Sequence, residues 1–570
     1  MKKQRSLLDF VWEVLFILFV LFPLLTGGVW YRSPSVKLEW TDLSALVPLF
    51  CLFTLLLHQK TNFNLYENPL FVFCKKLGTR WSNHLHKKPK SSLFLGIIFF
   101  GSLWSIESLF RHKNLQSHAY DLGIFTNALN NLNAGMGYRS SLKNGLNLFT
   151  DHQSPLFLLF APFYKLYPHP STLLILQNFL LASGAMAFTF YLKQVWKGKN
   201  KELIALSPFL YWFASPIRSA ARFEFHPEII FLPIALTGLV FLFNSVKKKQ
   251  MLGLLLLIIS LGSKESAPIT LLGLSFSLFW LHPFKRSKGF SIVLGIISIS
   301  VFLFDLKGVP LLLKHDYSYQ NHYKHLGNSL TQIIFSPLFK PVSFLKEFFN
   351  LPFLKFFIFV LIPLGGLSLR KKEFLPVIFF PLIILALDEG NHRLNSYYHY
   401  GIEPFFGAIA AFPFAILIFR KRFSEKNLVL FLLFTSLTGI GRSDFFWIRS
   451  FAQPHPKQPW ISERLIPCLN TKRTMSASGA LVPHLDSLWI QTLPLISVHP
   501  DWSSLDNAEC ILIDSELNNW PMQPSDWVTL EKKIKEIRYE KIYSCGSLNL
   551  FQHPKTEGNC LSCVPSCKYE

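Results

Sequence analysis

The chain has 570 residues, of which half are hydrophobic and only 16% are charged. A soluble chain of this length would divide into about four domains, but long apolar runs exclude that organisation for its first three quarters. A helix that crosses a bilayer needs about 20 mostly apolar residues, and several runs meet or approach this length. The sequence therefore predicts a polytopic integral membrane protein.

The formal net charge of +23 is unevenly distributed. Residues 445–570 carry 12 basic and 13 acidic residues, and the rest of the chain carries 45 basic and 21 acidic residues. An excess of Lys and Arg beside apolar helices is typical of cytoplasmic loops. A nucleic-acid-binding protein would instead gather its basic residues on one soluble face, so we exclude a nucleic-acid partner.

The first apolar run follows Lys2, Lys3 and Arg5 and continues past Leu25. Because the core of a signal peptide has only about 7–15 apolar residues, we interpret this run as a retained helix with a cytoplasmic N-terminus. Basic connectors later in the chain alternate with connectors that are poor in clustered charge. The positive-inside rule then predicts about 13 crossings, at residues 10–30, 43–57, 91–110, 171–192, 202–220, 228–246, 250–264, 266–282, 289–305, 353–369, 374–388, 401–419 and 427–441.

An odd number of crossings places the C-terminal tail outside the cytoplasm, together with outer loops 111–170 and 306–352. Helical spans and the charge asymmetry favour a bacterial inner membrane. We interpret the apolar stretch Pro155–Pro168 as a re-entrant or surface-lying helix, because a further crossing would put Lys247–Lys249 outside. The predicted organisation is an N-terminal transmembrane hairpin with a basic loop (1–90), a polytopic helical domain (91–444) and an extracytoplasmic domain (445–570).

The tail reads as a small soluble α/β domain. Short apolar runs predict strands at 477–482, 488–492, 510–513, 541–543 and 548–551, and residues 526–539 have helical spacing. Six cysteines lie in this tail: Cys468, Cys510, Cys545, Cys560, Cys563 and Cys567. An even number of cysteines outside the cytoplasm favours disulfides. Their spacing in the sequence does not define which cysteines pair. A metal site in Cys560, Cys563 and Cys567 is the alternative.

Polar residues gather at the predicted outer ends of the crossings. Singly, each has an ordinary explanation as a helix cap or an interfacial aromatic residue, but Lys264 and Glu265 stand between two apolar runs, where charge is costly unless it is paired or binds a charged ligand. Together the residues predict a cavity that holds an anionic head group and removes a proton. We expect Asp121 or Glu224 to act as the base, and Lys264, Arg222 and Arg393 to neutralise a phosphate. The other candidates for substrate binding are Tyr120, Asp151, His152, His226, Glu228, Glu265, His399 and Tyr400.

Histidines offer two possible metal sites. His226 and Glu228 could hold a divalent ion beside the expected base. His315, His322 and His325 would share one face of a helix, which suits a metal. For that second set we favour an amphipathic surface helix instead, with Tyr317, Tyr319 and Tyr323 at the membrane interface.

The ordered motifs resemble a prokaryotic membrane family called domain of unknown function 2079, over roughly residues 90–550. They are Tyr120–Phe125, Asp151–Pro155, Phe223–Glu228, Lys264–Glu265, His399–Tyr400, Leu481–Leu485 and Ile511–Asp514. This family is similar to the GT-C membrane glycosyltransferases, so the resemblance implies a GT-C-like membrane domain. The chain departs from the family in an extra hairpin at about residues 10–57, in Glu224 where Asp is usual, and in Ser266 where an acid is common.

The resemblance implies an inverting membrane glycosyltransferase that uses a polyprenyl-phosphate sugar as donor. Asp121 matches the acidic residue of the first large outer loop, which serves such enzymes as the base or binds the acceptor. The acceptor would be extracytoplasmic, and the tail could present it. The alternatives are a transporter or flippase of an envelope precursor, which would want ionisable residues at mid-membrane depth, and a non-catalytic envelope assembly protein.

Overall fold

A computed structural model describes residues 7–21, 29–32, 37–40, 64–196, 201–281, 288–315, 322–420, 423–437, 455, 457–495, 501–520 and 522–567, with residues 50, 53, 54, 56, 57 and 61. Near the N-terminus, α1 (Leu7–Phe16) continues into a π-helical turn (Ile17–Leu21), and β1 (Val29–Arg32) pairs with β2 (Lys37–Trp40) as an antiparallel hairpin. Strand β1 begins inside the run 10–30, so the first predicted crossing ends earlier than expected.

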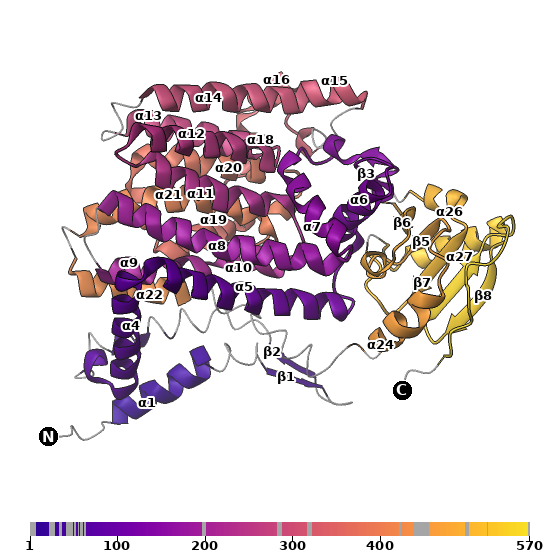
Figure 1. Ribbon diagram of the computed structural model, residues 1–570, viewed down its shortest axis with the longest axis horizontal. Helices are drawn as coiled ribbons and strands as arrows, with labels where there is room; N and C mark the ends of the chain where they lie inside the picture. The colour runs from indigo at the N-terminus through magenta and orange to yellow at the C-terminus, as the bar shows by residue number, and fades with distance from the viewer. Residues whose placement is uncertain are drawn as a thin grey trace.

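Most of the chain forms a body of helices, many of which run side by side (Figure 1). These are α4 (Pro69–Lys87), α5 (Pro89–Lys113), α8 (Pro170–Trp196), α9 (Lys201–Trp212), α10 (Ser215–Arg222), α11 (Phe231–Leu242), α12 (Lys247–Ser260), α13 (Ala267–Trp280), α14 (Lys288–Leu303), α19 (Leu351–Leu361), α20 (Leu375–Ala386), α21 (Ile402–Phe419) and α22 (Glu425–Leu437). Helices α5, α8, α11 and α12 pack in sequence, and α13 packs on both α14 and α20. This arrangement confirms the predicted helical architecture of this part of the chain.

The number of crossings stays a prediction. Among the described residues, four helices are long and apolar enough to cross a membrane: Pro89–Lys113, Pro170–Trp196, Lys288–Leu313 and His399–Phe419. Helices occupy the other predicted crossings too, but they are shorter, and run 43–57 lies mostly outside the described residues. The stretch Pro155–Pro168 forms a short 3-10 helix (Pro155–Phe160) and α7 (Ala161–Leu166).

Two glycines allow the central helices to approach closely. A Cβ atom on Gly273 of α13 would lie 2.6 Å from the carbonyl oxygen of Pro376, and one on Gly407 of α21 would lie 2.5 Å from that of Val377. Real Cβ atoms do not come so near to backbone oxygen, so α13 and α21 can flank α20 only because these positions lack side chains.

Short elements cover one end of the helical body. They comprise a π-helical turn (Ala119–Gly123), α6 (Ile124–Asn133), and the strands β3 (Arg139–Ser140) and β4 (Leu146–Asn147) from the first outer loop. The second outer loop contributes α15 (Val309–Leu313), α16 (Leu330–Ile334), α17 (Ser336–Phe339) and α18 (Pro341–Lys346). In the histidine-rich stretch, residues 316–321 lie outside the described part and residues 324–326 form a turn, so the described residues show no continuous surface helix there.

The tail is an α/β domain built on a five-stranded sheet of order β6-β5-β7-β9-β8. Its elements are α24 (Gln458–Trp460), α25 (Ile466–Cys468), β5 (Met475–Ala477), β6 (Ile490–Thr492), α26 (Ser503–Asn507), β7 (Cys510–Asp514), α27 (Asp526–Ile537), β8 (Glu540–Cys545) and β9 (Leu548–Gln552). Strands β6, β5 and β7 are parallel, and β9 runs antiparallel to β7 and β8. The predicted strand 477–482 is wrong beyond Ala477, because the chain turns at Ser478 and enters a 3-10 helix that contains Pro483.

Side chains from the first outer loop join the tail to the helical body. The Ser141 hydroxyl donates to the Ile490 carbonyl at 2.7 Å and accepts from the Ile490 amide at 2.9 Å. The Asn127 amide donates to the Leu488 carbonyl at 3.2 Å. Edge strand β6 is therefore held against the loop that carries Asp121, and the tail lies beside α6 and β3 (Figure 1).

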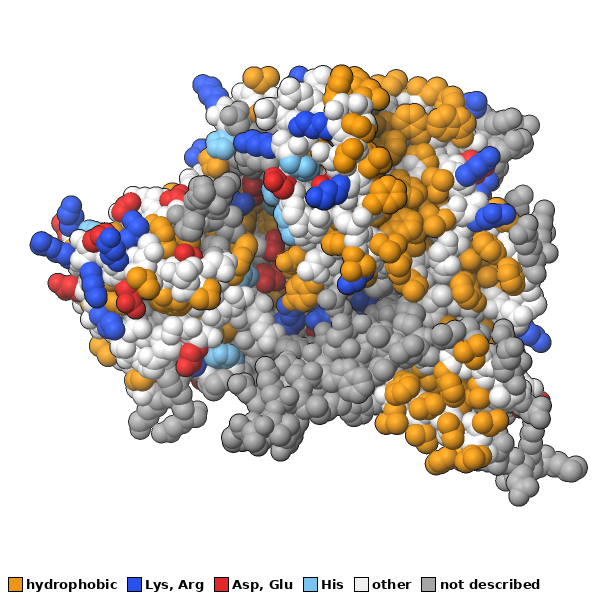
Figure 2. All heavy atoms as spheres, turned by 180° about the vertical axis from the view of Figure 1, so that it is seen from behind, with side chains coloured by type: hydrophobic (Ala, Val, Ile, Leu, Met, Phe, Trp, Pro, Cys, Tyr) orange, Lys and Arg blue, Asp and Glu red, His pale blue; other side chains and the backbone are white. Residues whose placement is uncertain are grey.

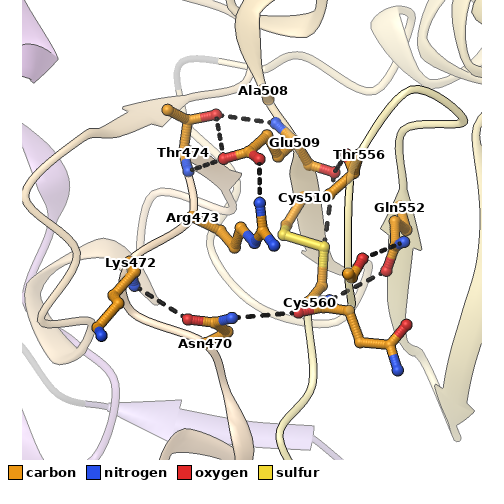
Figure 3. The surroundings of a disulfide bond; sticks show 12 residues. Asn470, Lys472, Arg473, Thr474, Ala508, Glu509, Cys510, Gln552, Thr556 and Cys560 are labelled. Carbon is orange, nitrogen blue, oxygen red and sulfur yellow. Dashed lines mark hydrogen bonds and ion pairs between the residues drawn. A yellow bond between two sulfur atoms is a disulfide. The ribbon is translucent and has the colours of Figure 1, made fainter.

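All six tail cysteines form disulfides, which confirms the prediction and fixes the connectivity. The pairs are Cys468–Cys563, Cys510–Cys560 and Cys545–Cys567. All three thiols of the alternative metal set are thereby used. Around Cys510–Cys560, the Arg473 guanidinium binds the Glu509 carboxylate at 2.7 Å and fastens the strand ends together (Figure 3).

Removing the central disulfide should destabilise the tail. The Cys510–Cys560 bond closes a loop with a sequence separation of 50, and the chain-entropy relation gives about 4 kcal/mol for such a loop. We expect the double substitution Cys510→Ser/Cys560→Ser to make the tail susceptible to protease at a lower temperature. Cys74→Ser, in α4, is the control. Equal resistance of the two proteins would contradict the prediction.

Candidate functional site

Glu228 is the centre of a buried cluster between the helical body and the outer loops. It follows the extended segment that ends α10 and lies in a 3-10 turn (Pro227–Ile230) that leads into α11. The Lys264 ammonium donates to its carboxylate. The Nε2 atom of His399 lies 3.2 Å from Oε1, and the Nδ1 atom of His226 lies 3.7 Å from Oε2. Three other candidate residues, from three separate motifs, therefore meet at the Glu228 carboxylate.

Asp121 reaches this cluster from the first outer loop. Its Oδ1 atom lies 4.0 Å from Nε2 of His226, and its side chain is 29% exposed. Burial, followed by repulsion from Glu224, raises the pKa of Asp121 well above its usual value. Burial, with the neighbouring His399 and Lys264, lowers the pKa of His226 well below its usual value. A partly accessible carboxylate thus faces a buried imidazole, and its raised pKa makes this carboxylate a better proton acceptor than an ordinary one.

Glu224 supports the Asp121 loop. Its carboxylate accepts the backbone N–H of Leu122 at 3.4 Å, one residue after Asp121. Burial raises the pKa of Glu224 to about 7, against hydrogen bonds from the backbone of His118 and Leu122 and the charge of Arg111. These contacts suit a positioning role, whereas a catalytic role for Glu224 stays a prediction.

His152 extends the cluster on the other side. Its Nδ1 atom lies 3.7 Å from Oε1 of Glu265, its ring centre lies 5.2 Å from that of His226, and Asp151 pairs with Lys143 at 3.0 Å. Burial would raise the pKa of Glu265, but the hydrogen bond and charge of His152 outweigh it and lower that pKa to about 2. The segment between α12 and α13 therefore presents the ionised Glu265 carboxylate beside His152.

Two of the expected substrate-binding residues lie outside this cluster. Arg222 pairs with the buried Glu107 of α5 through its Nε atom at 3.2 Å. The Tyr120 hydroxyl lies 2.5 Å from that of Thr492, in the contact with the tail. Both positions join the site to its surroundings, and direct roles in substrate binding stay predictions.

A cavity of about 700 Å³ opens beside Glu228 and Lys264. Its polar end includes Tyr400 and Arg393, and the Lys264 Nζ atom and the Arg393 guanidinium lie 5.1 and 5.9 Å from the centre of the Tyr400 ring. Its apolar wall is formed by Ile269, Phe302, Ile333, Ile334, Phe344, Pro381, Ile383 and Ile384. Figure 2 shows acidic and histidine side chains in a hollow beside the tail, and hydrophobic side chains over the helical body.

The cavity also contains Glu403, which the sequence places with Tyr400 among the polar residues at the outer ends of the crossings, and two charged residues that the sequence did not single out. Glu403 accepts hydrogen bonds from Ser266 at 2.6 Å and from Thr270 at 2.8 Å. Asp305 and Lys307 line the same space. The sequence feature that could have identified Asp305 and Lys307 is their opposite charges, which come immediately after an apolar run.

Two groups of side chains have the spacing of metal ligands among the described residues. One is His226, Glu228 and His399, and the other is His322, Asp388 and His392. In the first group, the Lys264 ammonium already neutralises Glu228. Of the predicted set His315, His322 and His325, only His322 belongs to a group of this kind in the described part of the chain, and its partners are Asp388 and His392. His325 instead lies 4.0 Å from Glu347.

Stability should respond to pH through Glu224. Its pKa is raised in the folded protein, so folding favours the protonated acid. This contribution is complete below the unfolded pKa of about 4.3 and is lost as the pH rises through about 7. Between those values, the thermal midpoint of Glu224→Gln should fall less than that of wild type. Parallel midpoint curves for the two proteins would refute the assignment.

Comparisons with known proteins give a family. The family model described as "Predicted membrane protein (DUF2079)" matches residues 111–548, and no curated protein matches the chain. Two crystal structures of ArnT from Cupriavidus metallidurans are similar, each with a TM-score of 0.48. The apo structure is 8% identical and the alignment covers 81% of this chain and 98% of that chain; for the structure bound to undecaprenyl phosphate the values are 9%, 80% and 97%. The family match includes all of the motifs that carry the resemblance, and the chain belongs to the DUF2079 family of predicted membrane proteins.

Proposed function

We propose that this chain is a membrane glycosyltransferase-like enzyme that transfers a sugar from a polyprenyl-phosphate donor to an extracytoplasmic acceptor. The amphipathic cavity supports this proposal. One end carries cations and carboxylates, and the other is a wall of aliphatic and aromatic side chains. A lipid phosphate has the same division, since its head is charged and its chain is apolar.

The observation that carries the proposal is the approach of two cations to one ring. Lys264 and Arg393 come from different loops, yet both lie within 6 Å of the Tyr400 ring centre. Each has a carboxylate on another side, Glu228 for Lys264 and Asp388 for Arg393. Both cations line the same cavity, so an anion bound there would be attracted by two positive charges in a partly buried site. A phosphate group, which accepts several hydrogen bonds, fits this position.

In the proposed reaction, Asp121 takes the proton from the nucleophile of the acceptor. The nucleophile attacks the anomeric carbon of the donor sugar, and the bond from that carbon to the phosphate oxygen breaks. The electron pair of that bond stays on the phosphate, whose growing charge Lys264 and Arg393 stabilise. A single displacement of this kind inverts the anomeric centre.

The tail has a defined place in this proposal. It contacts the loop that carries Asp121 through Ser141 and Asn127, so it can present the acceptor to the base.

We place the site and the tail outside the cytoplasm, the N-terminus inside, and the protein in a bacterial inner membrane, on the strength of the charge pattern. His226 and Glu228 are the residues that would hold a divalent metal in this site.

The test is sugar transfer by purified protein in detergent with added lipid. Wild type is mixed with polyprenyl-phosphate sugars labelled in the sugar and with a membrane extract as acceptor. We expect label to move from the lipid to the acceptor, and expect Arg393→Ala to raise the donor concentration needed for half-maximal rate. Lys532→Ala, on the exposed face of α27, is the control. Binding of donor without transfer of label would favour the transporter, and neither binding nor transfer would favour the assembly role.

A further inference from the structure

The second histidine group adjoins two residues that line the cavity, Tyr323 and Arg393. The Nδ1 atom of His322 is 2.9 Å from Oδ1 of Asp388, and the Nε2 atom of His392 is 3.2 Å from Oδ2. One ligand atom from each residue lies within 4.8 Å of the others. Bonds of about 2.0–2.2 Å to a tetrahedral zinc ion place its ligand atoms roughly 3.3–3.5 Å apart. Small movements of these side chains would therefore suffice to coordinate an ion.

Asp388 is a carboxylate in need of positive charge. It is fully buried, and within the described part of the chain neither of its oxygens accepts a hydrogen bond of normal geometry. It stands two residues beyond the end of α20, where the helix dipole is negative and favours a cation. Arg393 supplies one charge through Nε at 3.5 Å from Oδ1. The two imidazoles add positive charge only when they are protonated. A metal ion bound to them would supply positive charge directly.

The backbone holds both histidines beside Asp388. The amide of Glu389 donates to the carbonyl of His322 at 3.0 Å, which fastens the second outer loop to the end of α20. Gly390 and Asn391 adopt left-handed conformations, with φ of 85° and 58°, and this turn returns His392 toward Asp388. The side chains of His322 and His392 are 35% and 53% exposed. An ion can therefore enter from solvent, and water can complete its coordination.

We propose that His322, Asp388 and His392 bind a divalent transition-metal ion of the zinc class, with water as a fourth ligand. Neutral imidazole nitrogen and carboxylate oxygen are ligands that zinc accepts. The ion would clip the second outer loop to the turn after α20. Tyr323 and Arg393, next to two of the ligands, line the cavity, so the clip would also fix that wall. The proposal is independent of the glycosyltransferase proposal.

The site is tested by metal binding to purified protein that has been stripped with chelator and freed of any affinity tag. Cobalt(II) is the probe, because tetrahedral coordination gives it strong visible absorption, and zinc is then added in competition. We expect one equivalent to bind to wild type, and expect His392→Ala and His322→Ala to weaken binding at least tenfold. His325→Ala, in the same loop, should bind as wild type does.

A second comparison distinguishes this group from the cluster at Glu228. His226→Ala should leave cobalt binding unchanged if the ion occupies the proposed site. Loss of binding in His226→Ala with retention in His392→Ala would overturn the assignment, as would the absence of cobalt binding to wild type. His392 is half exposed, so its replacement should leave folding intact, and equal thermal midpoints of the stripped proteins verify that.

Discussion

Asp121→Asn is expected to lower the rate of sugar transfer by about 100- to 10,000-fold, the range that a general base contributes. The amide preserves the shape of the side chain but cannot accept the proton of the acceptor. Burial and Glu224 disfavour the charged form of Asp121, so loss of that charge should not destabilise the fold. The measurement is the transfer rate beside the thermal midpoint of the same preparation.

The control for this substitution is Asp506→Asn, an exposed acid in the tail, which should transfer at the wild-type rate. A base must be ionised to act, so the wild-type rate should rise with pH through the raised pKa of Asp121. Transfer by Asp121→Asn at the wild-type rate would remove the catalytic assignment while leaving the enzyme class. A reduced rate with a reduced midpoint would indicate a structural role instead.

The helical body could be predicted because apolar runs are a matter of composition, whereas the breaks within them depend on packing. Run 202–220 divides at Ala214, where the chain becomes extended before α10 begins with Ser215 and Pro216. Run 353–369 divides around Gly365 and Gly366, which adopt left-handed conformations. Both kinds of break occur at Pro or Gly, but the sequence contains many such residues in unbroken helices, including Pro381 within α20.

The site residues could likewise be recognised from local sequence, whereas their partners depend on the tertiary fold. Lys264 was recognisable because a cation between two apolar runs needs a partner. Its partner, Glu228, is 36 residues away. The two meet only because the 3-10 turn before α11 packs against the loop between α12 and α13. Arg222 stood at the outer end of a predicted crossing, and its partner Glu107 lies in the long apolar helix α5, where the sequence pointed to a crossing and not to a salt bridge.

Lys264→Ala should destabilise the protein by about 3–5 kcal/mol, the range for removal of one partner from a buried ion pair. Lys264 and Glu228 are 7% and 3% exposed, so the remaining carboxylate would be buried beside imidazoles that are charged only when protonated. Of the single substitutions considered, this one should lower the thermal midpoint most. Lys532→Ala, which removes an exposed ammonium, should leave the midpoint unchanged.

A double-mutant cycle separates the cost of the unpaired charge from other effects of the substitution. Glu228→Gln in the Lys264→Ala background removes the stranded carboxylate, so the double variant should be more stable than Lys264→Ala alone. Because the phosphate would also lose its cation, the double variant should recover stability without recovering transfer. Recovery of both would mean that Lys264 serves only to neutralise Glu228, and the anion site would then rest on Arg393 alone.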